Sequence, residues 1–257
     1  MYDQPGIDVR TDGAVRIVTL DQPDSLNAIT EDLLAQLVDL WADVEDDEGC
    51  RAIVLTGAGR AFSAGGSYEE FELRRVDLAA RRRSLRMGRR LAQHMLDVAV
   101  PVVAAVNGPA VGLGCTMTTL CDVVFMAEDA FLADTHVSVA LVAGDGGAVT
   151  WPAHTSLLRA KQYLLTGDRL GAAEAVAIGL ANFVVPADRL LPDAVAFAQR
   201  LAAQPAQAVQ ETKALLNQHL RANAVRALGY GLAAESQSHD LPDYREAAER
   251  LKPKGDP

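Results

Sequence analysis

The sequence has 257 residues. Its 49% hydrophobic content is enough for one sizeable core, which should be aliphatic because only 5% of the residues are aromatic. The formal net charge of −10 argues against nucleic acid as a partner, since binding to phosphates requires a cationic face. No apolar run reaches the roughly 18 residues of a membrane span, so no membrane partner is expected.

The N-terminal segment and the cysteines indicate the cytoplasm. The first residues contain no apolar run with a cationic lead, so they do not predict a secretory signal. Cys50, Cys115 and Cys121 show no metal-ligand spacing and cannot all pair, as expected of thiols that stay reduced. We therefore expect a cytoplasmic protein without a metal site.

The first half of the chain alternates between predicted strands and helices. Residues 13–23 are typical of a strand that runs into a turn at proline, and residues 30–49 of a helix with Thr30 as its N-cap. A short apolar strand follows and ends in a glycine-rich loop at residues 61–67. After an arginine-rich stretch, a second buried strand ends in another glycine loop at residues 107–115.

The rest of the chain is predicted to change from strands to helices. Residues 121–133 indicate a hairpin or a strand pair. From about residue 156 onward, segments rich in Ala and Leu and broken by Gly and Pro predict helices. No linker rich in Pro, Gly or Ser separates the two parts, so we expect one continuous structure with a helical rear part.

The two glycine loops, residues 61–67 and 107–115, have two interpretations. Neither has the Gly-Lys-Ser/Thr ending of a phosphate loop or the spacing of a dinucleotide fingerprint. Glycine after a strand is common turn chemistry. Alternatively, both loops expose backbone N–H groups that converge on one oxygen, which would form an oxyanion hole for a carbonyl that gains negative charge.

Six stretches of the chain resemble, in the same order, motifs of the crotonase superfamily of enoyl-CoA hydratases and isomerases. The resemblance implies an α/β fold, a spiral of β-β-α units with a helical C-terminal trimerisation region. It also implies a core with the active site over residues 1–195, an oligomerisation region over residues 196–257, and assembly as a homotrimer or a dimer of trimers. The stretches are LDQPDSLNAIT, AIVLTGAGRAFSAGGS, PVVAAVNGPAVGLGC, CDVVFMAEDAFL, LLTGDRLGAAEAVAIGLANFVVP and ETKALLN.

The resemblance implies an acyl-CoA thioester as the ligand. The thioester carbonyl would lie between the backbone amides of Ala64 and Leu113. No further cofactor is expected, because coenzyme A is part of the substrate. The arginine-rich stretch at residues 72–90 is by default a solvated helix face, although some of its arginines could meet the CoA phosphates. The other substrate-binding residues that the resemblance implies are Ala28, Gly65, Gly66, Ser67, Gly114 and Thr116.

The chain departs from a hydratase at the two catalytic positions. Hydratases of this superfamily position a water with two glutamates, and the matching positions here hold Thr116 and His136. A threonine hydroxyl is not a base near neutral pH, whereas an imidazole can be one if a carboxylate orients it. Asp145, nine residues after His136, is the candidate partner. As alternatives, His136 could be a structural residue held by Asp134, and Asp145 could cap a turn.

The His–Asp spacing resembles one subgroup in particular, the β-diketone hydrolases that open oxidised camphor. These enzymes also have a Trp-Pro pair, here Trp151-Pro152, and a C-terminal glutamate that matches Glu235. In them the His–Asp pair activates water for retro-Claisen carbon–carbon cleavage. Glu235 is therefore a third catalytic candidate, the alternative being an acid on a helix surface. Unlike that subgroup, this chain keeps the LNA stretch and the second glycine loop of a CoA-thioester site.

The leading hypothesis is an enzyme of the enoyl-CoA hydratase/isomerase family, of the lyase type. It would bind an acyl-CoA in the oxyanion hole and use His136, oriented by Asp145, as the general base in place of the glutamate pair. One alternative is a retro-Claisen hydrolase of a β-diketone or β-keto substrate. Another is a member of the family that binds CoA esters without catalysis.

Overall fold

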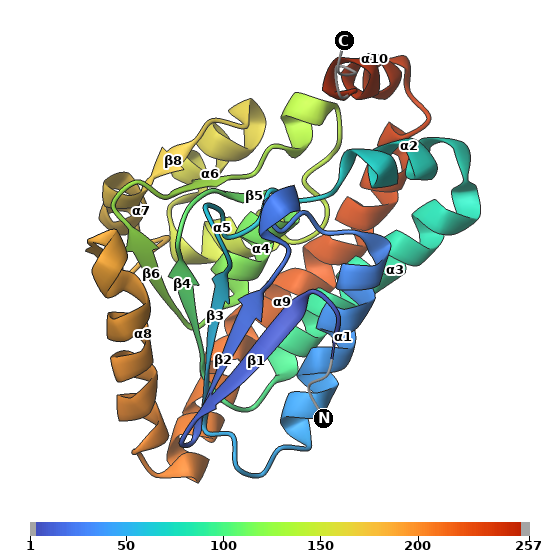
Figure 1. Ribbon diagram of the computed structural model, residues 1–257. Coiled ribbons are helices and arrows are strands. Elements are labelled where there is room, and N and C mark those ends of the chain that lie inside the picture. The colour runs from blue at the N-terminus through green and yellow to red at the C-terminus, as the bar shows by residue number, and fades with distance from the viewer. Residues whose placement is uncertain (1–3, 253–257) are drawn as a thin grey trace.

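The structure is a computed structural model that describes residues 4–252. Its main feature is a six-stranded sheet (Figure 1). Its strands are β1 (Ile7–Asp12), β2 (Val15–Leu20), β3 (Ala52–Gly57), β4 (Val102–Val106), β6 (Val123–Ala127) and β9 (Phe183–Val185). They lie in the order β1-β2-β3-β4-β6-β9, with β1 antiparallel to β2 and every other neighbouring pair parallel. β3 and β4 are buried along their whole length, as expected of apolar strands covered on both faces.

A second, smaller sheet lies beside the first. It consists of β5 (Ala110–Val111), β7 (Phe131–Ala133) and β8 (Leu170–Gly171), in the order β5-β7-β8. The chain passes repeatedly between the two sheets: β4 is followed by β5, β6 by β7, and β8 by β9. This alternation produces successive turns of a spiral and brings the loops after β3 and β4 to one end of the main sheet.

The prediction for residues 121–133 is only partly confirmed. The segment contains two strands, β6 and β7, but the expectation that they pair with each other is wrong. β6 pairs with β4 and β9, whereas β7 pairs with β5 and β8. A turn in which the Ala130 N–H donates to the Ala127 carbonyl redirects the chain into the second sheet.

Helices cover both faces of the main sheet (Figure 1). α8 packs along one face against β2, β3, β4 and β6, while α9 packs against α3 and α5. Thr30 Oγ1 accepts a hydrogen bond from the Leu33 N–H at 3.2 Å, which confirms the predicted N-cap. The helices are α1 (Glu31–Glu45), α2 (Tyr68–Val76), α3 (Leu78–Asp97), α4 (Leu113–Leu120), α5 (Gly147–His154), α6 (Leu157–Thr166), α7 (Ala172–Ile178), α8 (Ala187–Ala202), α9 (Ala206–Ser238) and α10 (Pro242–Leu251), with short 3-10 turns η1 (Pro23–Ser25) and η2 (His136–Val139).

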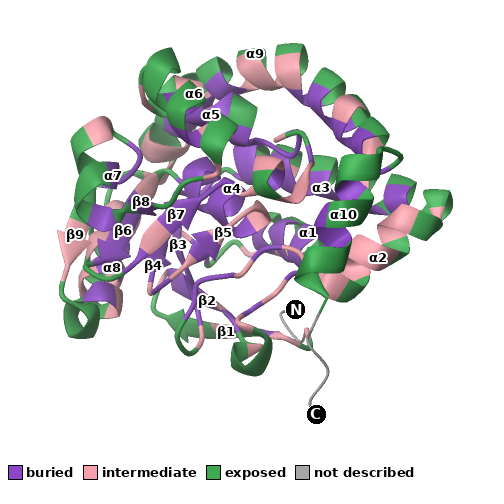
Figure 2. Ribbon diagram, turned by 90° about the horizontal axis from the view of Figure 1, so that it is seen from above, coloured by how far each residue is buried: buried purple, intermediate pink, exposed green. Residues whose placement is uncertain are grey.

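The core lies between the sheets and the inner faces of the helices (Figure 2). Several large apolar side chains nevertheless face outward on α6 and α9, among them Leu158, Val225 and Tyr230. The expected trimeric assembly stays a prediction, as does the division of the chain at residue 195, which falls inside α8. None of the helices within residues 4–252 is long and apolar enough to cross a membrane.

Candidate active site

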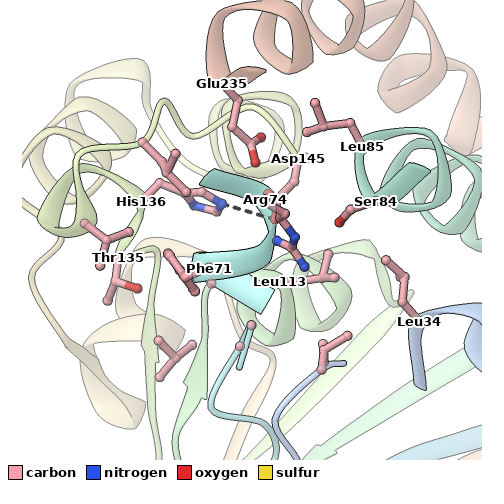
Figure 3. A pocket seen from close by; sticks show the side chains of 18 of the residues that line it. Leu34, Phe71, Arg74, Ser84, Leu85, Leu113, Thr135, His136, Asp145 and Glu235 are labelled. Atoms are coloured by element: carbon pink, nitrogen blue, oxygen red, sulfur yellow. Dashed lines mark ion pairs between the residues drawn. The ribbon is translucent and has the colours of Figure 1, made fainter. Parts of the chain in front are cut away.

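A cavity of about 410 Å³ lies at the end of the main sheet where β3 and β4 lead into their glycine loops (Figure 3). Its walls come from segments that are far apart in the sequence: the loop after β3, helices α2 and α3, the start of α4, the segment around η2, and α9. Loops at the carboxyl ends of parallel strands commonly form ligand sites, because neighbouring loops diverge there. The predicted site residues are therefore expected around this cavity.

The two glycine loops are bound to each other along their backbones. The Val111 N–H donates to the Ser63 carbonyl at 2.9 Å. Gly65 has φ +82°, and a Cβ placed on it would lie 2.8 Å from the carbonyl oxygen of Val111. Only glycine adopts this backbone conformation without strain and permits such a close approach. The glycines that mark these loops in the sequence thus permit close contact between the two loops.

Two residues that line the cavity, Gly66 and Leu113, have free backbone N–H groups, and one of them is not the residue that was predicted. The Ala64 N–H donates to the Leu26 carbonyl at 2.9 Å, so it is not available to a ligand. The Gly66 N–H, two residues later, makes no hydrogen bond within residues 4–252, and neither does that of Leu113. Leu113 begins α4, where the first N–H groups have no partner inside the helix. The Ala64 N–H is therefore not the free donor that was predicted, the free N–H of this loop is that of Gly66, and the role predicted for Leu113 stays a prediction.

His136 lies between two carboxylates on the opposite side of the cavity. Its Nδ1 is 2.6 Å from Asp134 Oδ1, and its Nε2 is 3.3 Å from Asp145 Oδ2. The other oxygen of Asp145 accepts a hydrogen bond from the Thr116 hydroxyl at 2.9 Å. Thr116 and His136 occupy the two positions at which the hydratase resemblance expects glutamates. The carboxylate of Asp145 is thus held between those two positions.

Glycines allow the segment that carries Asp145 to approach its neighbours closely. Gly144 packs against the backbone of Gly231 in α9: a Cβ added to Gly231 would lie 3.0 Å from the Gly144 Cα. A Cβ on Gly147 would collide with the carboxylate of Asp134. The glycines around Asp145 therefore let it approach His136 and let α9 approach the site.

The histidine and Asp145 influence each other's protonation. Burial lowers the pKa of His136, but the charges and hydrogen bonds of Asp145 and Asp134 outweigh burial and raise that pKa well above its ordinary value. Burial raises the pKa of Asp145, but His136 and the hydrogen bond from Thr116 outweigh it, so the net shift is downward. The arrangement favours an imidazolium between two carboxylates.

Glu235 reaches the cavity from α9 and is not an acid on the helix surface. The residue is only 5% exposed, and its Oε2 has no hydrogen-bond partner within the described chain. Burial, the largest influence, raises the pKa of Glu235 to about 7, although the positive charge of His136 opposes the shift. A carboxyl group with this pKa can give or take a proton at neutral pH.

The remaining predicted substrate-binding residues divide into two groups. Gly65 and Gly66 line the cavity. Ala28, Ser67, Gly114 and Thr116 are not among its lining residues. Ser67 caps α2 by accepting a hydrogen bond from the Glu70 N–H. Gly114 packs against Ser63, and Thr116 lies behind Asp145.

Two residues of the site did not stand out in the sequence. Asp134 was only an alternative partner of His136, yet it makes the shorter of the two contacts with the ring. Arg74 projects into the cavity although it belongs to the arginine-rich stretch (Figure 3). No periodicity distinguishes it from the other arginines there, so only its position in the fold identifies it.

Asp134, His136 and Asp145 also form a group that could in principle hold a metal ion. Their candidate ligand atoms all lie within 4.8 Å of one another. However, each ring nitrogen of His136 already faces a carboxylate oxygen. A metal ion would have to displace one of these contacts, so the described geometry fits an acid–base site better than a metal centre.

Comparisons with known proteins identify the family of the chain. A family model described as enoyl-CoA hydratase/isomerase covers residues 10–254. A putative enoyl-CoA hydratase from Thermus thermophilus is 38% identical over 207 residues, which are 79% of this chain and 81% of that protein. A crystal structure of an enoyl-CoA hydratase/isomerase from Mycobacterium paratuberculosis is 50% identical with a TM-score of 0.93, covering 97% of this chain and 100% of that one.

A third relative comes from the subgroup that the His–Asp spacing resembles. It is a β-diketone hydrolase from the cyanobacterium Anabaena sp. PCC 7120, bound to (S)-3-oxocyclohexyl acetic acid. It is 27% identical with a TM-score of 0.86, covering 93% of this chain and 96% of that one. Together with the spiral of two sheets, these matches confirm the α/β fold of the crotonase superfamily and show that the chain belongs to the enoyl-CoA hydratase/isomerase family.

Proposed function

We propose that the protein adds water to the double bond of a 2-enoyl-CoA, with Asp145 and Glu235 as the acid–base pair. The observation that carries this proposal is the placement of the Asp145 carboxylate, which Thr116 and His136 both hold. These two residues replace the hydratase glutamates, yet together they present a carboxylate to the cavity. The site thus retains the kind of group that hydration requires.

The N–H groups of Gly66 and Leu113 would bind the thioester carbonyl oxygen. When water attacks the β-carbon, negative charge moves onto that oxygen, and N–H donors that are already in place stabilise it. Both residues line the cavity, and their N–H groups have no other partner within the described residues. Removing one donor of this kind generally costs about 10²- to 10³-fold in kcat.

The two carboxyl groups have environments that separate their pKa values. The pKa of Asp145 is lowered, so this residue is ionised and would accept a proton from the attacking water. The pKa of Glu235 is raised to about 7, so a protonated fraction is present to protonate the α-carbon. Transfer of a proton from Asp145 to Glu235 then restores both groups, and the net reaction consumes one water.

In this proposal His136 is a protonated positioning residue. The sequence suggested a neutral histidine as the base, but the raised pKa favours the imidazolium at neutral pH. Its charge lowers the pKa of Asp145 and holds the carboxylate. In His136→Gln we expect the acid limb of the pH–rate profile to move to higher pH, because Asp145 loses the positive charge that keeps it ionised. An unchanged limb would contradict this role.

The proposed reaction is tested by hydration of crotonyl-CoA, followed as the loss of enoyl absorbance. We expect the wild type to turn over and Glu235→Gln to lose about 10²-fold or more in kcat, because an amide cannot donate the proton. Glu211→Gln, at an exposed position of the same helix, is the matched control and should keep full activity. A wild type that hydrates neither crotonyl-CoA nor a 2-enoyl-CoA with a terminal carboxylate, such as glutaconyl-CoA, or full activity in Glu235→Gln, would refute the proposal.

Retro-Claisen hydrolysis of a β-keto substrate is the second candidate. It is favoured by the contact between His136 and Asp145 and by the similarity to the β-diketone hydrolase. The water oxygen would bond to the β-carbonyl carbon, the bond between the α- and β-carbons would break, and the α-carbon would take the proton. Release of a carboxylic acid from a 3-oxoacyl-CoA or a cyclic β-diketone, without hydration of crotonyl-CoA, would favour this reaction. Binding of CoA esters without any turnover would favour a non-catalytic role.

A further inference from the structure

Arg74 is a charged group of the cavity that the proposed hydration does not use. It lies near the end of α2, lines the cavity, and has a side chain that is only 16% exposed. Its Nη1 would lie 4.0 Å from a Cβ built on Gly66, so the guanidinium is beside the amide assigned to the thioester carbonyl. Figure 3 shows its guanidinium among the side chains that line the cavity.

The guanidinium of Arg74 has no close carboxylate partner. Within residues 4–252 its only ion pair is with Glu70 Oε2, at 3.9 Å, which is too long for a hydrogen bond. The other oxygen of Glu70 accepts a hydrogen bond from the Glu31 N–H at 3.1 Å. The Nε of Arg74 is buried and has no hydrogen-bond partner in the described chain.

Neighbouring arginines differ from Arg74 in this respect. Arg75 Nη2 lies 2.9 Å from Glu72 Oε2. Arg81 donates to Asp240 Oδ1 at 2.9 Å and also to a backbone carbonyl. Both are therefore engaged within the protein, and neither is among the residues that line the cavity. Arg74 combines a position in the cavity with unused donors.

We propose that Arg74 binds a carboxylate on the acyl group, so that the substrate is the CoA thioester of a dicarboxylic acid. This inference rests on the proposed function, which places the thioester carbonyl at Gly66. A guanidinium presents a planar fork of donors that matches the two oxygens of a carboxylate. An uncharged acyl chain would leave this largely buried cation with only the Glu70 carboxylate at 3.9 Å, whereas a carboxylate on the acyl group would supply a close partner.

The position of Arg74 distinguishes this role from contact with the CoA phosphates. In any CoA ester the pantetheine arm separates the thioester from the phosphates. A cation beside the carbonyl-binding amide of Gly66 is therefore next to the acyl group. The nearby lining residues Phe71 and Leu85 are apolar, as suits the carbon chain between the two ends of a short diacid.

The test measures binding of saturated CoA esters, which cannot be hydrated, by titration calorimetry. The probes are malonyl-, succinyl- and glutaryl-CoA, each compared with the uncharged ester of equal carbon number: propionyl-, butyryl- and valeryl-CoA. We expect the wild type to bind at least one charged ester about tenfold or more tightly than its uncharged counterpart. Because no turnover is involved, the result is independent of which reaction the enzyme catalyses.

Arg74→Met should remove the preference and leave binding of the uncharged esters unchanged. Arg75→Met, which changes the adjacent arginine outside the cavity lining, is the matched control and should keep the preference. The proposal is overturned if the wild type shows no preference at any of the three lengths or if Arg74→Met retains one. Equal weakening of charged and uncharged esters in Arg74→Met would also overturn it and would indicate contact with the CoA phosphates.

Discussion

The two sides of the cavity are built in different ways. On one side are backbone N–H groups of Gly66 and Leu113, positioned by glycine loops that bind each other. On the other side are the side chains of His136, Asp145 and Glu235, which come from η2, the following loop and α9. The position of the backbone N–H groups depends on glycines, which have no Cβ atom and let the loops approach each other. The chemistry of the other side depends on the identity of the side chains that the fold brings together. Under the proposed function, the acid–base side chains can therefore change without a change in the backbone that would bind the carbonyl.

The largest expected effect is that of Asp145→Asn, which should lower kcat and leave ligand binding almost unchanged. Asp145→Asn keeps the shape of the side chain but removes the proposed proton acceptor. We expect kcat for crotonyl-CoA to fall by about 10³-fold, while the Kd of butyryl-CoA changes less than about threefold because the amides are untouched. Steady-state kinetics and calorimetry measure the two quantities. A parallel loss in both would mean that the two sides of the cavity do not act separately.

Glu235 should limit stability at high pH, since its pKa of about 7 in the folded protein exceeds the ordinary value of 4.5. The folded state binds more protons than the unfolded state between these values, so the free energy of unfolding falls as pH rises through them. Ionised Glu235 therefore costs about 3 kcal/mol at pH 8 and little at pH 4.

Glu235→Gln should remove that cost. We expect the variant to be more stable than the wild type at pH 8 by about 2–3 kcal/mol, with the difference vanishing toward pH 4. Urea denaturation at the two pH values measures it, with Glu211→Gln as the control. Equal changes in the free energy of unfolding for both variants, or a difference that does not depend on pH, would show that burial does not raise the pKa of Glu235.

The backbone side is tested by adding one methyl group. Gly65→Ala must adopt a φ of +82° and places Cβ 2.8 Å from the Val111 carbonyl oxygen. Gly13 also has a positive φ, +58°, but has nothing within 4 Å of its Cβ position. Gly13→Ala should cost about 1 kcal/mol through the backbone alone, and Gly65→Ala about 2 kcal/mol more. Equal losses of unfolding free energy would contradict the close contact between the loops.

The smallest expected effect concerns Thr116. Thr116→Val removes the hydroxyl that donates to Asp145, and this hydrogen bond helps to lower the pKa of Asp145. We therefore expect that pKa to rise, the acid limb of the pH–rate profile to move to higher pH, and kcat at neutral pH to fall about tenfold or less. Thr116→Ser, which keeps the hydroxyl, should restore the wild-type profile.

The sequence by itself determined the family, the two glycine loops, the cap at Thr30 and the absence of both hydratase glutamates. These features are local: a cap or a glycine turn depends on a few neighbouring residues, and ordered motifs survive as short strings. The nine-residue spacing also made Asp145 the candidate partner of His136.

Only the tertiary structure decided which groups face the cavity. Ala64 and Gly66 are two residues apart, and which N–H is free depends on whether the Leu26 carbonyl lies opposite. Glu235 is buried because α9 passes the segment around Gly144 at close range, which no helical pattern reveals. Burial and neighbouring charges set the pKa values of the acid–base groups, and both arise from contacts between segments that are remote in the chain. A sequence records such contacts only indirectly, so the roles of these residues follow from the fold.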